Sequence, residues 1–406
     1  MTTAFEPITI GPITLKNRFI KAATNEAMSI QGAPSAGLLK HHRDIAAGGA
    51  ALTTVAYLAV APEARTLDVQ SWLRPEIIPD LRAVTDAVHT QNGAISAQIT
   101  HGGSFVTGMK LHQAAISASA GLNKAGLLAG NFWQRAMTEA DMARIETEFT
   151  AGALICQQAG FDAVELHLGH GYLLNQFISP LSNKRSDQYG GDATRRMKFP
   201  LRVLARVKDA VGAKMAVICK INVADGVPGG ATAADGVVTA QLLERAGADL
   251  LVLSSGRNME SVWYMFGSPM NMQAMRKALG GNWLQQQFLR LASLGVPKDL
   301  RFTDLYRLAE SEQIRAAVRL PLAYLGGAVS LPNAESLLAK GFDAIAMGRA
   351  LLHDPALINK FQDGSATRSA CTHCNACVAS IYHQDGTACV DNTPNDPRLN
   401  QIRAAP

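Results

Sequence analysis

Two histidines and a tyrosine, His167, His170 and Tyr172, stand within six residues, directly after an apolar run that ends at Leu166. Two imidazoles can hold a carbonyl oxygen, and a phenol can deliver a proton to a neighbouring carbon. An HxxH pair at the end of a strand can equally be a structural pair or a weak metal site. These residues alone leave both interpretations open, so the surrounding sequence has to decide.

Polar residues also mark other β-like runs. Asn25 follows the first run, Gln98 stands near the end of the third, and Lys220 lies inside the run VICKIN. Asn25 could cap a turn, and Gln98 could satisfy a backbone group. Lys220 is harder to explain in this way, because an unpaired buried ammonium group is costly and needs an anionic partner.

Two short glycine motifs, Gly326-Gly327 and Gly348-Arg349, follow the last two β-like runs. Glycine lets a phosphate approach main-chain N–H groups, and arginine can hold two oxygens at once. One such pair by itself is more often a turn than a ligand site. Two pairs after the seventh and eighth strands of a barrel match the usual phosphate site of that fold.

The elements that would position these residues alternate between short β-like runs and helix-like segments, as in βα units around a parallel sheet. Eight units predict an α/β protein with a closed (β/α)8 TIM barrel, whose working face is the carboxyl end of the strands. An open doubly wound sheet is the alternative, but no GxGxxG motif follows the first strand. The expected strands are Arg18–Ala23, Ala51–Ala56, Ala94–Ile99, Ala163–His167, Met215–Asn222, Leu250–Ser254, Leu322–Leu325 and Ala344–Met347.

Composition limits the class of protein. The 406 residues are 48% hydrophobic and 17% charged, which is enough apolar material for a large core. A net charge of +5 with scattered basic residues indicates no nucleic-acid partner. The uncharged stretch 45–62 is rich in Ala, Gly and Thr and predicts no membrane span. No secretory signal is apparent, so we expect a cytoplasmic protein, and a homo-oligomer is left open.

The run HLGHGYLLNQFISPLSNKRSDQYGG, which begins at His167, resembles the old yellow enzyme family of FMN-dependent oxidoreductases. Further matches are the segments 97–103 (AQITHGG) and 346–355 (AMGRALLHDP). They occur in the order of the family over about residues 5 to 360. The resemblance therefore implies an FMN-binding barrel that uses NAD(P)H.

The resemblance also implies roles for single residues. Those expected at the flavin ring are Asn25, Ala56, Gln98 and Lys220, and those expected at the FMN phosphate are Gly326, Gly327, Gly348 and Arg349. Two positions depart from the family: Lys220 stands where many relatives have arginine, and Asn25 where threonine or cysteine is common. Both are polar, so the site is retained, but the flavin potential is expected to differ.

The cysteines of the C-terminal part are spaced C-x2-C-x2-C-x11-C, at Cys371, Cys374, Cys377 and Cys389. Such clustering in a cytosolic protein favours metal binding or redox chemistry over structural disulfides. The spacing is similar to that of the trimethylamine dehydrogenase and 2,4-dienoyl-CoA reductase branch, where it ligates a [4Fe–4S] centre. Zinc and unmetallated thiols are the alternatives.

The expected organisation is an FMN-binding barrel over residues 1–366 and a cysteine-rich extension over 367–406. Within the barrel, residues 256–318 form a long insertion after the sixth strand. It is either a pair of ordinary packed helices or a lid over the flavin, in which Trp263, Tyr264 and Met265 would select substrates.

The predicted function is reduction of an activated C=C bond in a small enone or enoyl substrate. Hydride passes from NAD(P)H to flavin N5 and then to the β-carbon, while His167 and His170 hold the carbonyl oxygen. Tyr172 then protonates the α-carbon. The alternatives are an amine dehydrogenase that passes electrons through a cysteine-bound cluster, and a non-catalytic barrel that binds a phosphorylated ligand.

Overall fold

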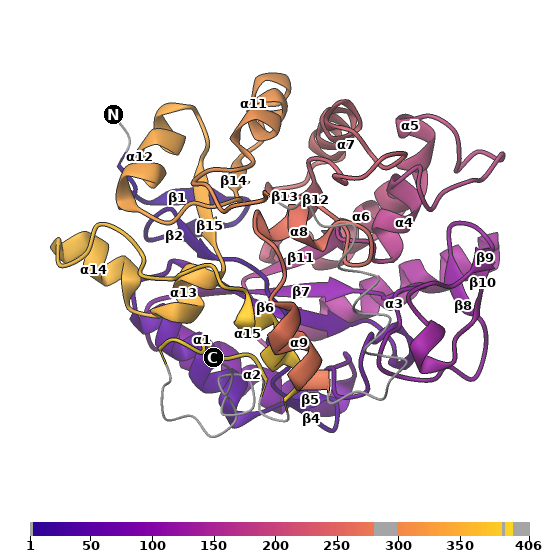
Figure 1. Ribbon diagram of the computed structural model, residues 1–406, viewed down its shortest axis with the longest axis horizontal. Coiled ribbons are helices and arrows are strands. Elements are labelled where there is room, and N and C mark those ends of the chain that lie inside the picture. The colour runs from indigo at the N-terminus through magenta and orange to yellow at the C-terminus, as the bar shows by residue number, and fades with distance from the viewer. Residues whose placement is uncertain (1–2, 280–298, 384–385, 393–406) are drawn as a thin grey trace.

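A computed structural model describes residues 3–279, 299–383 and 386–392 of the chain. Eight parallel strands close into a barrel, and helices surround it (Figure 1). The strands follow one another around the barrel in chain order, so the predicted TIM barrel is confirmed. They are β3 (Phe19–Lys21), β6 (Leu52–Ala59), β7 (Ala94–Thr100), β11 (Ala163–Leu168), β12 (Ala216–Asn222), β13 (Leu250–Ser254), β14 (Leu322–Tyr324) and β15 (Ala344–Met347).

The outer helices cover the strands. They include α1 (Ala36–Ala47), α2 (Ile78–His89), α3 (Glu139–Gln158), α4 (Leu173–Ile178), α5 (Ala193–Arg196), α6 (Lys198–Val211), α7 (Ala233–Arg245), α11 (Leu308–Ala317), α12 (Leu331–Ala339), α13 (Arg349–His353) and α14 (Leu357–Asp363). Local signals set their starts: the hydroxyl groups of Thr138 and Thr232 accept hydrogen bonds from the first turns of α3 and α7. None of the described helices is both long and apolar enough to cross a bilayer.

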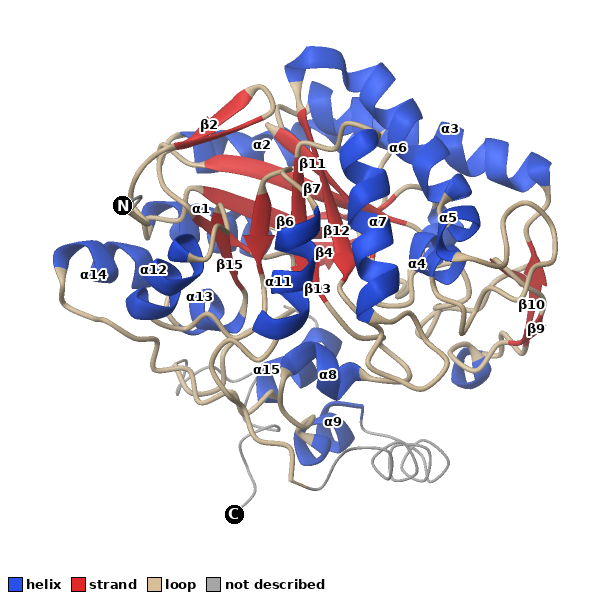
Figure 2. Cartoon of the chain, turned by 90° about the horizontal axis from the view of Figure 1, so that it is seen from above, coloured by secondary structure: helices blue, strands red, loops and turns tan. Residues whose placement is uncertain are grey.

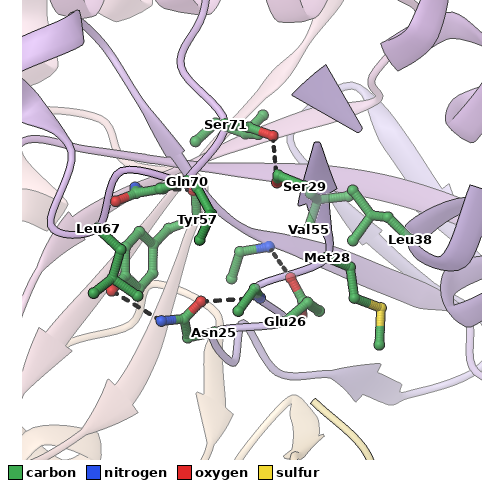
Figure 3. A pocket seen from close by; sticks show the side chains of 14 residues that line it. Asn25, Glu26, Met28, Ser29, Leu38, Val55, Tyr57, Leu67, Gln70 and Ser71 are labelled. Atoms are coloured by element: carbon green, nitrogen blue, oxygen red, sulfur yellow. Dashed lines mark hydrogen bonds between the residues drawn. The ribbon is translucent and has the colours of Figure 1, made fainter. Parts of the chain in front are cut away.

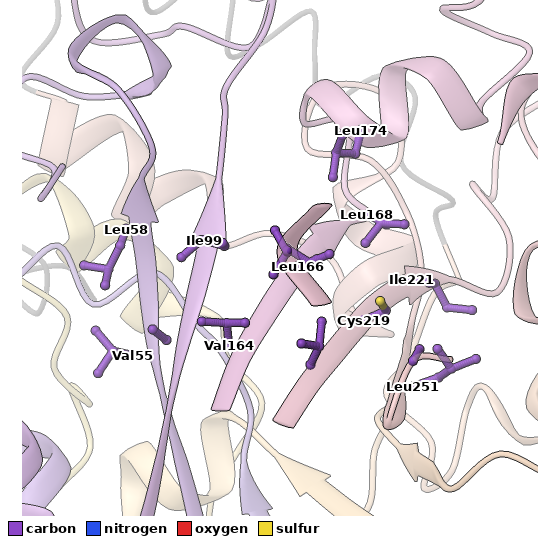
Figure 4. Packing of buried hydrophobic residues seen from close by; sticks show 14 of the residues in the cluster. Val55, Leu58, Ile99, Val164, Leu166, Leu168, Leu174, Cys219, Ile221 and Leu251 are labelled. Atoms are coloured by element: carbon purple, nitrogen blue, oxygen red, sulfur yellow. The ribbon is translucent and has the colours of Figure 1, made fainter. Parts of the chain in front are cut away.

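Strand side chains alternate between two cores. Outward residues such as Val164, Leu166 and Ile221 pack under the helices (Figure 4). Inward residues at the amino end of the barrel, including Ile218 and Val252, form a second, smaller core. The alternation explains why Glu165 and His167, between outward leucines, point into the barrel.

A hairpin that the sequence reasoning did not predict closes the amino end of the barrel. It consists of β1 (Ile8–Ile10) and β2 (Ile13–Leu15), paired antiparallel. Ile10 and Leu15 are almost completely buried and join the inner core. The working face is therefore the opposite end.

Three excursions leave the barrel. Between β7 and α3, a small sheet contains β8 (Ala115–Ser117), β10 (Trp133–Ala136) and β9 (Gly121–Leu122), in that order. A short hairpin of β4 (Ser29–Ile30) and β5 (Ala33–Pro34) follows β3. The insertion 256–318 contains α8 (Val262–Phe266) and α9 (Met272–Leu279), and its residues 280–298 lie outside the described chain.

The described part of the C-terminal extension packs against that insertion. The short helix α15 (Ala376–Ala379) contacts α9 through Ala274, Ala376 and Ala379, and both lie with α8 beyond the carboxyl ends of the strands (Figure 2). Further along, the Thr387 hydroxyl donates to the carbonyl oxygen of Asn25 at 2.7 Å. The extension thus contacts the first loop of the barrel.

Candidate active site

A cavity of about 980 Å³ lies at the carboxyl ends of the barrel strands. Its volume is in the range of cofactor and substrate sites. His167, His170 and Tyr172 line it. So do six of the eight residues expected to hold FMN, which are Asn25, Gln98, Lys220, Gly327, Gly348 and Arg349.

The two other expected residues, Ala56 and Gly326, do not line this cavity. Ala56 packs with Tyr57 and Tyr172, and it borders a separate void of about 20 Å³ beside Glu26 (Figure 3). The Gly326 carbonyl accepts a hydrogen bond from the Tyr324 hydroxyl at 2.7 Å. A side chain at position 326 would meet Arg307 at 2.7 Å, so its glycine makes room for that arginine.

The two histidines lie next to each other, with ring centroids 4.8 Å apart. His167 Nδ1 accepts a hydrogen bond from the Gly169 N–H, so the neutral ring carries its proton on Nε2. His170 Nε2 is 2.7 Å from the Ser254 hydroxyl, which holds that ring in place. Burial lowers the pKa of both histidines well below the usual value, so they are neutral hydrogen-bonding groups at neutral pH.

Tyr172 stands at the start of α4 and is 4% exposed. Its ring contacts His167, with centroids 4.5 Å apart, and meets Phe105 edge to face. Burial, followed by the neighbouring Tyr57, raises the pKa of Tyr172 well above 10. The phenol is therefore protonated and can act as an acid.

Sequence reasoning missed Tyr57. It lies inside the apolar run of β6, where it resembles an ordinary strand residue, yet it lines the cavity. Its hydroxyl accepts from Asn25 Nδ2 at 3.2 Å and is 3.0 Å from the hydroxyl of Thr66 (Figure 3 shows the Asn25 contact). A phenol at the carboxyl end of a barrel strand was the only available signal.

The floor of the cavity is polar. Gln98 and Lys220 reach it from β7 and β12, and Glu165 lies beneath them on β11. The expected burial of Lys220 is confirmed at 2% exposure. Its charge already has an anionic neighbour in the protein, because Glu165 opposes the lowering of the Lys220 pKa by burial.

The opposite end of the cavity suits an anion. Gly327 has φ +83°, and a side chain there would meet Tyr306 at 2.7 Å and a main-chain nitrogen at 3.0 Å. Gly348 precedes α13, and Arg349 is its first residue. The bare main chain and the guanidinium fit the phosphate of FMN.

Arg349 also contacts the C-terminal extension. Its guanidinium donates to Asn375 Oδ1 at 2.5 Å, to the Ser268 hydroxyl at 3.2 Å and to the Phe266 carbonyl at 2.7 Å. Asn375 lies between Cys374 and Cys377. The proposed phosphate end and the cysteine segment are therefore directly connected.

The cysteine segment forms part of the cavity wall. Cys377 lines the cavity, and all four thiols lie close enough together to influence one another electrostatically. Burial raises the pKa of Cys377 to about 12, whereas the charge of Arg349 acts to lower it.

The insertion supplies a further wall. Methionines 259, 265, 270, 272 and 275 line the cavity, together with Trp263 and Phe266. Tyr264 instead donates to Glu310 and stacks under Arg307, with 3.2 Å between the guanidinium carbon and the ring centroid. Of the three residues expected to select substrates, Trp263 and Met265 line the cavity, whereas Tyr264 does not.

A second cluster of ionisable groups is formed by α1 and the segment that follows β3. Glu26, His41 and His42 place possible ligand atoms within 4.8 Å of one another. The Lys21 ammonium is paired with Glu26 Oε1, and the Ala56 N–H donates to Glu26 Oε2 at 2.6 Å (Figure 3). Both carboxylate oxygens are engaged, so Lys21 is the cation of this cluster.

The chain belongs to the NADH:flavin oxidoreductase / NADH oxidase family, whose model matches residues 3–263. It is 38% identical over 401 residues to the 4,4'-dithiodibutanoate disulfide reductase of Rhodococcus erythropolis, and the match covers 96% of each chain.

Two solved structures have the same fold. The old yellow enzyme homologue from Zymomonas mobilis aligns with a TM-score of 0.72 and 19% identity, over 98% of this chain and 99% of that one. A 2-naphthoyl-CoA reductase aligns with a TM-score of 0.78 and 21% identity, over 99% of this chain but 58% of that one. These two structures show that the fold is shared, and the family model over residues 3–263 confirms the resemblance to the FMN-dependent oxidoreductases.

Proposed function

We propose that the protein uses FMN and NAD(P)H to reduce the activated C=C bond of small α,β-unsaturated carbonyl compounds. The supporting observation is the arrangement of His167, His170 and Tyr172, two neutral imidazoles and a protonated phenol in contact at one wall of the cavity. Family membership supports an oxidoreductase over a non-catalytic barrel.

The proposed FMN contacts are Gln98, Lys220 and Asn25 at the ring, and Gly327, Gly348 and Arg349 at the phosphate. When bound, FMN would accept a hydride from NAD(P)H and supply it to the β-carbon of the alkene. His167 Nε2–H and His170 hold the carbonyl oxygen and stabilise the negative charge that develops on it. The Tyr172 O–H delivers the proton to the α-carbon.

The four cysteines are proposed to hold a [4Fe–4S] centre. The support for this proposal is the C-x2-C-x2-C-x11-C spacing of the cysteines along the chain, together with the mutual proximity of the four thiols.

A second candidate substrate is an organic disulfide, which the name of the Rhodococcus relative suggests. Hydride would go to one sulfur as the S–S bond breaks, and Tyr172 would protonate the other, giving two thiols. The oxidative alternative, an amine dehydrogenase, is supported only by the proposed cluster.

Rapid-mixing kinetics on anaerobically purified protein test these proposals. The absorption spectrum, with iron, sulfide and zinc assays, identifies the cofactors first. Flavin reduced by NAD(P)H is then mixed with a cyclic enone or an organic disulfide, and oxidised flavin is mixed with an amine. Reoxidation by the enone, slowed about 10²- to 10⁴-fold in Tyr172→Phe, supports the enone reductase. Reoxidation by the disulfide alone favours the second candidate, and no response to the enone contradicts the first.

A further inference from the structure

Gln98 and Lys220 form the floor of the cavity, and Glu165 lies beneath them on the strand between; each of the three is at most 2% exposed. Glu165 is opposite Gln98 in the register of β7 and β11, and it lies two residues before His167. Because inward side chains recur every second residue, Glu165 is one layer deeper than the histidine that lines the cavity. Gln98 and Lys220 also line the cavity, whereas Glu165 does not.

The carboxylate of Glu165 determines which end of the Gln98 amide faces the cavity. Gln98 Nε2 donates to Glu165 Oε1 at 2.6 Å. Because Glu165 Oε1 accepts this hydrogen bond, the NH2 group points down to it and the carbonyl oxygen points away; a carboxylate held ionised by Lys220 can only accept and so fixes this orientation. No described residue donates to Gln98 Oε1, and that oxygen is left as an acceptor on the floor of the cavity.

Glu165 also balances the charge of Lys220. The Lys220 ammonium donates to the Ala23 carbonyl at 2.8 Å. Burial disfavours both charged groups, and the opposite charge of each favours the ionised form of the other. The floor therefore presents Gln98 Oε1 as a hydrogen-bond acceptor and Lys220 as a cation. The negative charge of Glu165 beneath them partly cancels the field of that cation.

We infer that Glu165 is a positioning residue for the cofactor, which orients the Gln98 carbonyl toward a ring N–H and moderates the field of Lys220. This inference rests on the proposed function. The chemistry that such a floor recognises is an imide, an N–H flanked by carbonyl groups, as in the pyrimidine ring of a flavin. Glu165 touches neither cofactor nor substrate and acts only through Gln98 and Lys220.

The test is Glu165→Gln, measured by the affinity for oxidised and reduced FMN. The new amide has the same shape but can donate as well as accept, so it no longer selects one orientation of Gln98. It also leaves Lys220 uncompensated, which favours reduced, anionic FMN. We expect oxidised FMN to bind about tenfold more weakly, and the preference for reduced over oxidised FMN to rise at least tenfold. A tenfold rise in that preference raises the two-electron reduction potential of the bound FMN by about 30 mV.

Two further variants keep the inference falsifiable. Glu146→Gln changes another buried carboxylate, on α3, and should leave both affinities unchanged. If Glu165→Gln does not fold, Lys220→Met removes the unbalanced charge. The variant that combines both changes should then bind oxidised FMN at least tenfold more weakly than Lys220→Met alone, because the amide at position 165 no longer selects one orientation of Gln98.

The outcomes separate the two proposals. A folded Glu165→Gln protein with wild-type affinities and potential would show that Glu165 is merely structural and would overturn this inference alone. Equal FMN affinity of the double variant and Lys220→Met would do the same. A wild-type protein that binds no FMN would overturn the proposed function and this inference with it.

Discussion

The rings of Tyr57 and Tyr172 meet edge to face at 5.2 Å between centroids, one on β6 and the other at the start of α4. Tyr172 is the proposed acid, so this contact places a second phenol beside the group that loses a proton. Tyr57 favours the protonated form of Tyr172 in the resting arrangement. Once Tyr172 has given up its proton, the Tyr57 hydroxyl can rotate and donate to the phenolate.

Tyr57→Phe should therefore slow the enone half-reaction about tenfold, the effect of losing one hydrogen bond of roughly 1.5 kcal/mol. Flavin reduction by NAD(P)H should be nearly unchanged. Rapid mixing separates the two steps. Tyr189→Phe, which removes a phenol bonded to Glu139 on the outside of the barrel, is the control. Equal loss in both half-reactions would indicate that Tyr57 only packs.

His167→Ala combined with His170→Ala should weaken binding of a phenolic or enone ligand about 10- to 100-fold, because two hydrogen bonds of about 1 kcal/mol each are lost. Flavin titrations measure this affinity. Since the pKa of each histidine is well below 6.5, enone affinity of the wild-type protein should be flat between pH 6 and 8. A steep change across that range would mean that charged imidazoles bind the ligand.

Stability should fall as the pH is lowered below about 6.5. Burial lowers the pKa of His41 and of His101 to about 3, so each is neutral in the folded protein but charged in the unfolded chain between about pH 3 and 6.5. The unfolded state then binds more protons, and each such histidine costs roughly 1.4 kcal/mol per pH unit in that window.

Denaturant unfolding at pH 7 and pH 5 measures this loss, and His101→Asn should show a smaller one. His89, half-exposed and bonded to Asp162, is the matched site for the control variant His89→Asn. Unchanged pH dependence in His101→Asn would contradict the assignment.

Arg349→Ala should raise the dissociation constant of FMN at least 100-fold, because charge-assisted hydrogen bonds to a phosphate are worth about 1.5–3 kcal/mol each. Fluorescence titration of apoprotein measures it. Asn375→Ala, which removes only the partner at 2.5 Å, should have a smaller effect in the same direction. Arg368→Ala breaks a surface pair with Asp304 and should change nothing. Retention of tightly held FMN by Arg349→Ala would remove this arginine from the site.

Much of the barrel could be predicted because its signals are local. Each strand is a short apolar run, and the glycines near 327 and 348 stand directly after such runs. The structure shortens the first predicted strand to Phe19–Lys21 and extends the second to Ala59. The residue at which a strand ends depends on its hydrogen bonds to neighbouring strands, which are distant in the sequence.

The missed residues share that dependence on distant partners. Glu165 looked like one charge in a strand, and its role follows only from the register that places Gln98 opposite it. Tyr57 looked like strand packing until the fold brought Tyr172 to it. The sequence of the β1–β2 hairpin does not indicate whether it closes the barrel or forms a surface turn. Only the burial of Ile10 and Leu15 in the inner core shows that it closes the barrel.

Thr387 donates hydrogen bonds to the carbonyl groups of Asn25 and Glu26. Thr387 and Asn25 are 362 residues apart in the chain. On the ribosome, Asn25 emerges long before Thr387, so this contact cannot form until the seven barrel strands from β6 to β15 have been synthesised. The cavity therefore gains its last wall late in assembly. The topology of the chain therefore sets the earliest point at which this cavity can be complete.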